Sequence, residues 1–302
     1  MKRLSLLFLA LAATLATAFA APVPANDLFS KTYDYTGFTS LNVSNAFRVE
    51  LSFAPDYEVY IEVPAYLEPF LRINQAGSIL QIDLESLPAD IQKKLSKETN
   101  RLKARVAMPK LLNLKASGAV SINPHGKLAL GQESLFVQLS GASELNDLQA
   151  AGRQVSVQLS GASKAAVQGA FEDKVVVDLS GASKLRYKGD TDKLMVECSG
   201  ASSLEAEGQH DEIVCNVSGS SKCAISGKAN NLTLEASGAS KFEMDGEVKK
   251  AFTELSGVAK CRLAVREKLT YEISGVSSLR IKDLGAVAKG NISRGSKIEY
   301  IR

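Results

Sequence analysis

Apolar and polar residues alternate along most of the chain, and this alternation repeats about every 19 residues. Each repeat contains a Ser-Gly dipeptide, and we number positions from its serine as zero. The last copy has arginine in place of glycine. The serines are Ser117, Ser140, Ser160, Ser180, Ser199, Ser218, Ser237, Ser256, Ser274 and Ser293. Positions −1, −3 and −5 are apolar in most copies and position −2 is polar, which predicts a strand with one buried face.

A second alternation follows the Ser-Gly dipeptide. Position +5 is apolar from Leu145 to Ile298, and position +9 is glycine in five consecutive copies, Gly169 to Gly246. Each repeat therefore predicts a strand, a tight Ser-Gly corner, a second strand and a glycine turn. Alanine is almost constant at position +2, as in Ala142. Its small side chain predicts a corner that points into a narrow part of the core.

One such unit cannot bury its apolar face alone, whereas stacked units can. Because the repeat has no helical pattern, each strand must pair with the same strand of the next copy, about 4.8 Å away. The predicted fold is all-β, a right-handed parallel β-helix that forms a single-domain β-solenoid. A left-handed hexapeptide helix needs an aliphatic residue at every sixth position, and a propeller needs repeats of about 40 residues, so both are disfavoured. Hairpin pairing is disfavoured because consecutive copies look equivalent.

The chain before the repeat is strand-rich but lacks the 19-residue period. We expect residues 21–113 to form irregular first coils that cap the β-helix, and residues 114–302 to form its repetitive part. A short helical insertion is expected near residues 87–101, where Pro88 suits a first helical turn. The charged residues 289–302 are expected to cap the other end, because open strand edges pair readily with other chains.

Residues 1–20 have the pattern of a secretory signal peptide. Lys2 and Arg3 precede an uncharged apolar run, and Ala18-Phe19-Ala20 gives the small-x-small pattern of a cleavage site. The run is too short for a transmembrane anchor, which needs roughly 20 apolar residues. Because the first cysteine is Cys198, we expect no lipid attachment at a new N-terminus. The expected location is the periplasm or the cell surface.

Charge and composition exclude some partners. Removing Lys2 and Arg3 with the signal peptide lowers the formal net charge from +3 to +1. A near-neutral chain has no general attraction for nucleic acid. Tryptophan is absent and aromatic residues make up 6% of the chain, which argues against aromatic platforms for sugars or bases.

Four cysteines in an exported protein would ordinarily suggest two disulfides. All four fall at inward positions of the repeat: Cys198, Cys215, Cys223 and Cys261. Cys223 and Cys261 share a column but lie two coils apart, about 9–10 Å, and a disulfide needs Cα atoms within roughly 7 Å. The offset between Cys198 and Cys215 is also too large, at about 8 Å by the same spacings. We therefore predict four free, buried thiols.

Few residues carry the patterns of catalysis. His125 and His210 are the only histidines, and the repeat register predicts two solvated loop residues without partners, so a Ser/His/Asp triad is disfavoured. Ser-Lys pairs recur in most coils, as at Ser163-Lys164, which is typical of a structural corner with hydroxyls capping turn groups rather than of a single nucleophile. We expect no catalytic residues, no cofactor and no metal site.

Two charged columns follow from the repeat. An acidic column at position −2 is interpreted as a solvated strand face, with calcium binding left open. It contains Asp178, Glu197, Glu235, Glu254 and Glu272. A lysine column at position +4 contains Lys164, Lys184, Lys222, Lys241, Lys260 and Lys297, with Ser203 and Ser278 as gaps. It serves either solubility and protection against lateral pairing or the binding of an acidic polymer such as an anionic glycan along a linear groove.

Two segments and the repeat resemble a known bacterial family. Residues 37–51, from Gly37-Phe38-Thr39 to Leu51, and residues 106–118, ending at Ser117-Gly118, resemble the putative auto-transporter adhesin, head GIN domain family, as does the Ser-Gly-Ala-Ser repeat. The resemblance implies a right-handed parallel β-helix with a pectin-lyase-like shape. It also implies an envelope protein of adhesive role without known catalytic residues.

The leading hypothesis is a non-catalytic exported envelope protein that binds or adheres through a face of the β-helix, with an acidic glycan or a surface protein as partner. One alternative is a polysaccharide-active enzyme of pectin-lyase type. That enzyme would need one coil with clustered Asp, Arg or His, and no such coil is present. Another alternative is a purely structural envelope rod. An ice-binding face is disfavoured because it would need flat arrays of threonine.

Overall fold

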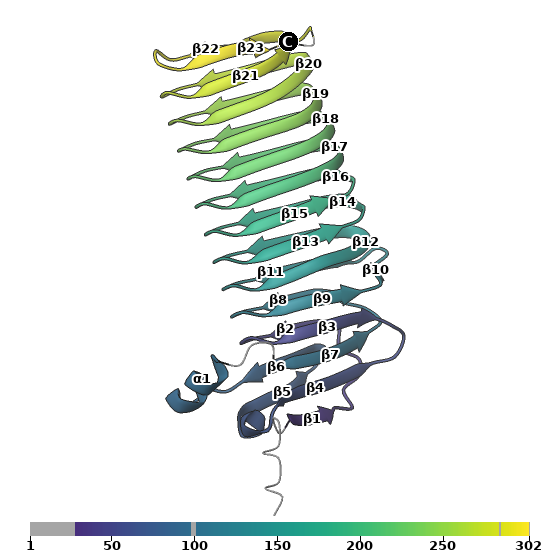
Figure 1. The fold of residues 1–302 in the computed structure, drawn as a ribbon. Coiled ribbons are helices and arrows are strands. Elements are labelled where there is room, and N and C mark those ends of the chain that lie inside the picture. The colour runs from purple at the N-terminus through teal and green to yellow at the C-terminus, as the bar shows by residue number, and fades with distance from the viewer. Residues whose placement is uncertain (1–27, 98–100, 284, 302) are drawn as a thin grey trace, which may run out of the picture.

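The computed structural model describes residues 28–97, 101–283 and 285–301, which form an elongated rod of stacked coils (Figure 1). Residues 1–20, predicted to be a signal peptide, lie outside the described residues. Equivalent strands of successive coils pair in parallel and in register, as in Lys222↔Lys241 and Leu234↔Thr253. Both of these offsets are 19 residues. The predicted β-solenoid is confirmed.

Most of the rod is built from strands that repeat from coil to coil. They are β8 (Asn113–Ala116), β9 (Ser121–His125), β10 (Lys127–Ala129), β11 (Ser134–Leu139), β12 (Glu144–Leu159), β13 (Lys164–Gln168), β14 (Phe171–Leu179), β15 (Lys184–Lys188), β16 (Thr191–Cys198), β17 (Ser203–Val217), β18 (Lys222–Ala236), β19 (Lys241–Leu255), β20 (Lys260–Ile273), β21 (Ser278–Asp283), β22 (Val287–Ile292) and β23 (Lys297–Ile301). In β17 to β19 the strand continues through the expected glycine turn, which is therefore a bend within a paired strand.

The first part of the chain departs from the parallel pattern. It contains β1 (Leu28–Thr32), β2 (Ser40–Val43), β3 (Arg48–Phe53), β4 (Glu58–Pro64), the 3₁₀ helix η1 (Ala65–Phe70), β5 (Leu71–Ala76), β6 (Ile79–Leu84), α1 (Ala89–Leu95) and β7 (Lys103–Met108). β2 and β3 join the stack by pairing in parallel with β8 and β9. β4 pairs antiparallel with β1 and β7, and β5 pairs antiparallel with β6. The expected helical insertion is present as α1, which buries none of its residues.

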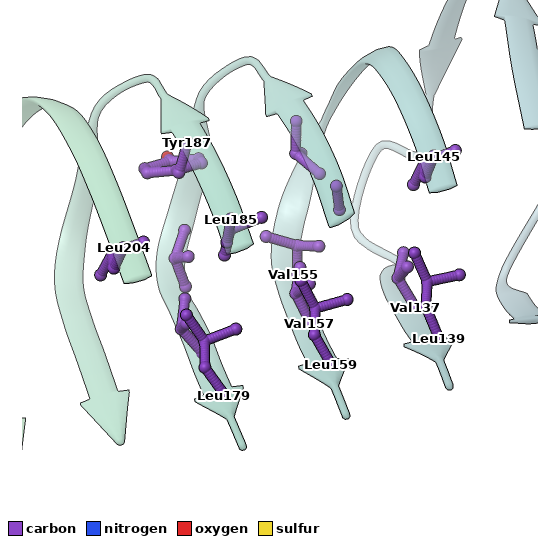
Figure 2. Close-up of a cluster of buried hydrophobic side chains, with 14 of the residues drawn as sticks. Val137, Leu139, Leu145, Val155, Val157, Leu159, Leu179, Leu185, Tyr187 and Leu204 are labelled. Carbon is purple, nitrogen blue, oxygen red and sulfur yellow. The ribbon is translucent and has the colours of Figure 1, made fainter. Parts of the chain in front are cut away.

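Two strands per coil enclose one continuous apolar core. The first strand spans positions −6 to −1 and the second spans +4 to +8. Figure 2 shows Val137 and Leu139 of first strands facing the same interior as Leu145 and Leu185 of second strands. All four side chains are at most 1% exposed. The polar positions between them consequently lie on the two outer faces of the rod.

The Ser-Gly corner faces the core differently from the sequence prediction. Ala142 and its counterparts at position +2 are exposed, so the expectation that alanine points into the core is wrong. The serine at position +3 is buried instead, and Ser163 is 0% exposed. Its hydroxyl donates to the Ser160 carbonyl oxygen at 2.8 Å. This bond satisfies a polar group that apolar burial would leave unpaired.

The last coil also differs from the prediction. Residues 287–292 and 297–301 do not form a cap but continue the solenoid as β22 and β23. Within the described residues, β22 pairs with β20 and β23 with β21, and neither strand has a partner on its other side. The inward residues Ile292 and Tyr300 are 46% and 60% exposed because no further coil covers them.

The four cysteines are free and buried, as predicted. Burial raises the pKa of the Cys261 thiol far above its ordinary value. The cysteines therefore act as small apolar residues in the core.

Candidate binding faces

The six lysines of the predicted site lie in one column, at the first residue of successive second strands. Backbone pairing places Lys164 beside Lys184, Lys222 beside Lys241, and Lys241 beside Lys260. Ser203 and Ser278 occupy the two gaps. Because position +5 points into the core, position +4 points outward. We call the outer surface of the second strands the lysine face.

Three lysines of this column form ion pairs with glutamates of position +6. Lys184 Nζ lies 3.2 Å from a carboxylate oxygen of Glu205 on the next coil. Lys241 and Lys297 pair with Glu243 and Glu299 at 2.8 and 2.7 Å. Hydrogen bonds from the lysines hold the pKa of all three carboxyls below their ordinary value. The glutamates therefore stay ionised at neutral pH and reduce the positive charge of the column.

The other three lysines of the column lie outside these ion pairs. Lys164, Lys222 and Lys260 are exposed and have no ion-pair partner among the residues that the structure describes. Exposed pairs are weak, at about 0–1 kcal/mol each, so the paired lysines also remain available to a ligand. The column thus presents positive charge at each coil except the two with serine.

Cations gather most densely at the C-terminal end of the lysine face. A hollow of about 320 Å³ is lined there by Lys241, Lys260 and Lys297 together with Arg262 and Arg280. Arg262 and Arg280 were not among the predicted site residues. They stand at position +6, which has the same outward parity as position +4, and this parity in the sequence identifies them as members of the face.

The acidic column lies on the outer surface of the first strands, which we call the carboxylate face. Asp178 pairs in register with Glu197, and Glu235 with Glu254 and then Glu272. Asn216 stands between Glu197 and Glu235. None of the five carboxylates has an ion-pair partner within the described part of the chain. A groove of about 730 Å³ runs between this column and the Ser-Gly corners.

Both histidines differ from the prediction of solvated loop residues without partners. His210 is 5% exposed, because it occupies an inward position between Thr191 and Ala229 of the neighbouring coils. Neither of its ring nitrogens makes a hydrogen bond of normal geometry. His125 is exposed, but its Nε2 lies 2.6 Å from a Glu50 carboxylate oxygen. The register missed this contact because Glu50 belongs to the less regular part before the repeat.

The described residues assemble neither a Ser/His pair nor a cluster of metal ligands. Neither histidine hydrogen-bonds to a serine there, so no Ser/His pair is assembled. No group of three or more His, Cys, Asp or Glu within the described ranges is placed to hold a metal ion. The described charges lie instead in columns along the two outer faces of the rod.

The family model described as putative auto-transporter adhesin, head GIN domain, matches residues 37–187 and 171–283. The chain belongs to this family. Residues 37–51 and 106–118, which carried the resemblance, lie within the match. No curated protein matches the chain.

Solved structures of proteins from two Parabacteroides species resemble this chain. A putative adhesin from Parabacteroides distasonis is 14% identical with a TM-score of 0.51, over 92% of this chain and 98% of that one. A putative adhesin from Parabacteroides merdae is 14% identical over the same shares, with a TM-score of 0.47. A putative lipid binding protein from Parabacteroides distasonis is 10% identical, again over 92% and 98%, with a TM-score of 0.45. The first of these likenesses shows a shared fold.

Among the described residues, no helix has both the length and the apolar character needed to cross a membrane.

Proposed function

We propose that this head GIN protein is a non-catalytic binding protein of the cell envelope that holds an acidic glycan along its lysine face. The observation that carries the proposal is the row of lysines at successive second strands, Lys164 to Lys297. Coil spacing places the backbones of neighbouring lysines about 4.8 Å apart. A polymer with a carboxylate or sulfate on each sugar carries regularly spaced negative charges. Several of these charges can contact lysines of the row at the same time.

The hollow at the C-terminal end is the strongest part of this face. Lys260 and Arg262 stand side by side on the outer surface of β20 and have no ion-pair partner within the described part of the chain. Arg280 adds a guanidinium from the next coil. It pairs with Glu299 at 2.8 Å, and this exposed ion pair exchanges readily for a carboxylate or sulfate of the ligand. We therefore place the tightest contact with the glycan here.

Export through a cleaved signal peptide, with release into the periplasm or to the cell surface, belongs to the same proposal. The supporting observations are the sequence pattern of residues 1–20 and membership of an adhesin family. The pectin-lyase-type enzyme is disfavoured because the charged groups lie in columns on outer faces and not around one cleft.

The test is binding of the mature protein, residues 21–302, to heparin and polygalacturonate, with neutral dextran as reference, at about 0.15 M salt. Replacing Lys241, Lys260 and Lys297 with Gln removes three contacts of up to about 1 kcal/mol each. We expect affinity for the acidic polymers to fall on the order of 10- to 100-fold.

The matched control replaces Lys174, Lys250 and Lys268 with Gln. These lysines lie on first strands, on the opposite outer face, so the change in net charge is the same. Equal losses in both variants would mean that net charge, and not the lysine face, governs binding. Unchanged affinity in the lysine-face variant would overturn the proposal.

A further inference from the structure

Between Lys164 and Asn291, the charges of the lysine column and of the acidic column follow the same pattern along the rod. Each lysine of the column from Lys164 to Lys260 is followed 12 to 14 residues later by a carboxylate of the other face. The two interrupting serines are followed in the same way by asparagines. The matched residues are Lys164 and Asp178, Lys184 and Glu197, Ser203 and Asn216, Lys222 and Glu235, Lys241 and Glu254, Lys260 and Glu272, and Ser278 and Asn291. Charge thus matches opposite charge, and neutral matches neutral.

No contact within the molecule accounts for this match. The two columns lie on opposite outer faces, with the apolar core between them. Within the described ranges, the ion pairs of the lysine column go to Glu205, Glu243 and Glu299 of its own face. The matched charges can attract each other only when the two columns belong to different molecules in contact.

The geometry of the coil allows such a contact by translation alone. Position −2 lies just before the Ser-Gly corner and position +4 just after it. A second rod moved across the faces without rotation keeps its corners on the same side, so its carboxylate column comes over the lysine column of the first. The matched residues are less than one coil apart in the chain. Displacing the second rod along its axis by less than one coil spacing, about 4.8 Å, therefore aligns every pair.

We propose that a second copy of this chain docks its carboxylate face on the lysine face of the first, with the rods parallel. All the matched pairs then meet, and the neutral gaps Ser203 and Asn216 meet each other. The charged residues of both columns lie at the surface, and the ion pairs of Lys184 and Lys241 are exposed and readily exchanged. Since the contact joins two different faces, it leaves one of each free and extends into rows of rods.

Sedimentation velocity of the mature protein tests this docking. At about 0.02 M salt, where charges interact over tens of ångströms, the average mass is expected to rise with protein concentration beyond that of a dimer. At about 0.5 M salt it is expected to return to the monomer value, because screening then acts within a few ångströms. A monomer at low salt at all soluble concentrations would overturn the proposal.

Charge reversal tests the pairing of the two faces. One variant carries Glu235, Glu254 and Glu272 changed to Lys, and the other carries Lys222, Lys241 and Lys260 changed to Glu. Each variant alone presents two faces of like charge and is expected to stay monomeric, whereas an equimolar mixture is expected to associate. Circular dichroism confirms that both fold. Association of either variant alone at the wild-type level, or no association in the mixture, would overturn the proposal.

Docking of a second copy and glycan binding both use the lysine face, but separate experiments can contradict each of them. Changing Glu235, Glu254 and Glu272 to Gln is expected to abolish self-association and to leave binding of heparin at least as strong. A wild-type protein that self-associates but does not bind heparin would contradict the proposed function alone. Self-association that survives the Gln variant would contradict the docking alone.

Discussion

At the scale of single residues, backbone conformation and burial explain the roles of Gly227 and His210. Gly227 has a φ of 134°, and a Cβ at this position would overlap the carbonyl oxygen of Gly208 on the preceding coil. Glycine is therefore required at position +9 by the close approach of stacked bends. His210 occupies an inward position where the neighbouring coils have Thr191 and Ala229. Its imidazole is consequently a polar group held in an apolar column.

The burial of His210 predicts a dependence of stability on pH. Burial lowers the pKa of His210 below its ordinary value of 6.5, and the nearby charge of Asp190 opposes this only in part. The unfolded chain therefore binds a proton first as the pH falls, so the stabilising contribution is complete above pH 6.5 and is lost below it.

We expect the melting temperature of the wild type to fall between about pH 7.5 and about pH 5, a range above the titration of ordinary carboxyls. His210→Leu should reduce this fall and raise the melting temperature at the lower pH. Thermal melts of both proteins across the range measure the difference. If the melting temperatures of both proteins fell equally with pH, the pKa of His210 would not be lowered in the folded state, and the prediction would be wrong.

At the scale of the coil, the buried serines at position +3 differ in their hydrogen bonding. Ser163 and Ser240 both occupy position +3 and are at most 1% exposed. The Ser163 hydroxyl donates to the Ser160 carbonyl oxygen, whereas the Ser240 hydroxyl has no hydrogen-bond partner. One column therefore contains a satisfied and an unsatisfied hydroxyl in nearly the same environment.

This pair predicts opposite results for the same substitution. Ser163→Ala removes a buried hydrogen bond and leaves a carbonyl less well satisfied, at a cost of about 1–2 kcal/mol. Ser240→Ala removes an unsatisfied polar group and should change the free energy of unfolding by less than about 0.5 kcal/mol. Urea denaturation of the two variants provides the comparison. A larger loss for Ser240→Ala than for Ser163→Ala would contradict the assignment of the corner bonds.

The whole molecule is a stack in which each coil is stabilised by its neighbours. Central strands such as β18 pair along their full length with β17 on one side and β19 on the other. β22 and β23 are each paired on one side only within the described residues, and every residue of β22 is exposed. In such a nearly one-dimensional array, stability depends on the interfaces that each unit makes.

Amide hydrogen exchange should therefore differ along the rod. We expect the amides of β17 to β19 to exchange only through large-scale unfolding, and those of β22 and β23 to exchange orders of magnitude faster through local opening. Mass spectrometry of peptides from the two regions, at low protein concentration and moderate salt, gives the rates for the monomer. Uniform protection from β17 to β23 would indicate that the last coil is covered in solution.

The sequence by itself determined the period, the inward positions and the parallel pairing, because alternation within a strand fixes which side chains are buried. It also placed the six lysines in one column and the four thiols in the core. Only the tertiary structure decided how the corner is buried. Gly161 turns outward at position +1, so the inward odd positions resume at Ser163, and Ala162 stays exposed.

Contacts between coils likewise depended on three-dimensional placement. The pairing of Lys184 with Glu205 joins residues 21 positions apart, and the contact of His125 with Glu50 joins residues 75 positions apart. Local periodicity carries no information about side-chain rotamers across such gaps. The depth at which a side chain lies, as for His210, depends on how the bends of successive coils stack, and that stacking is a property of the folded rod alone.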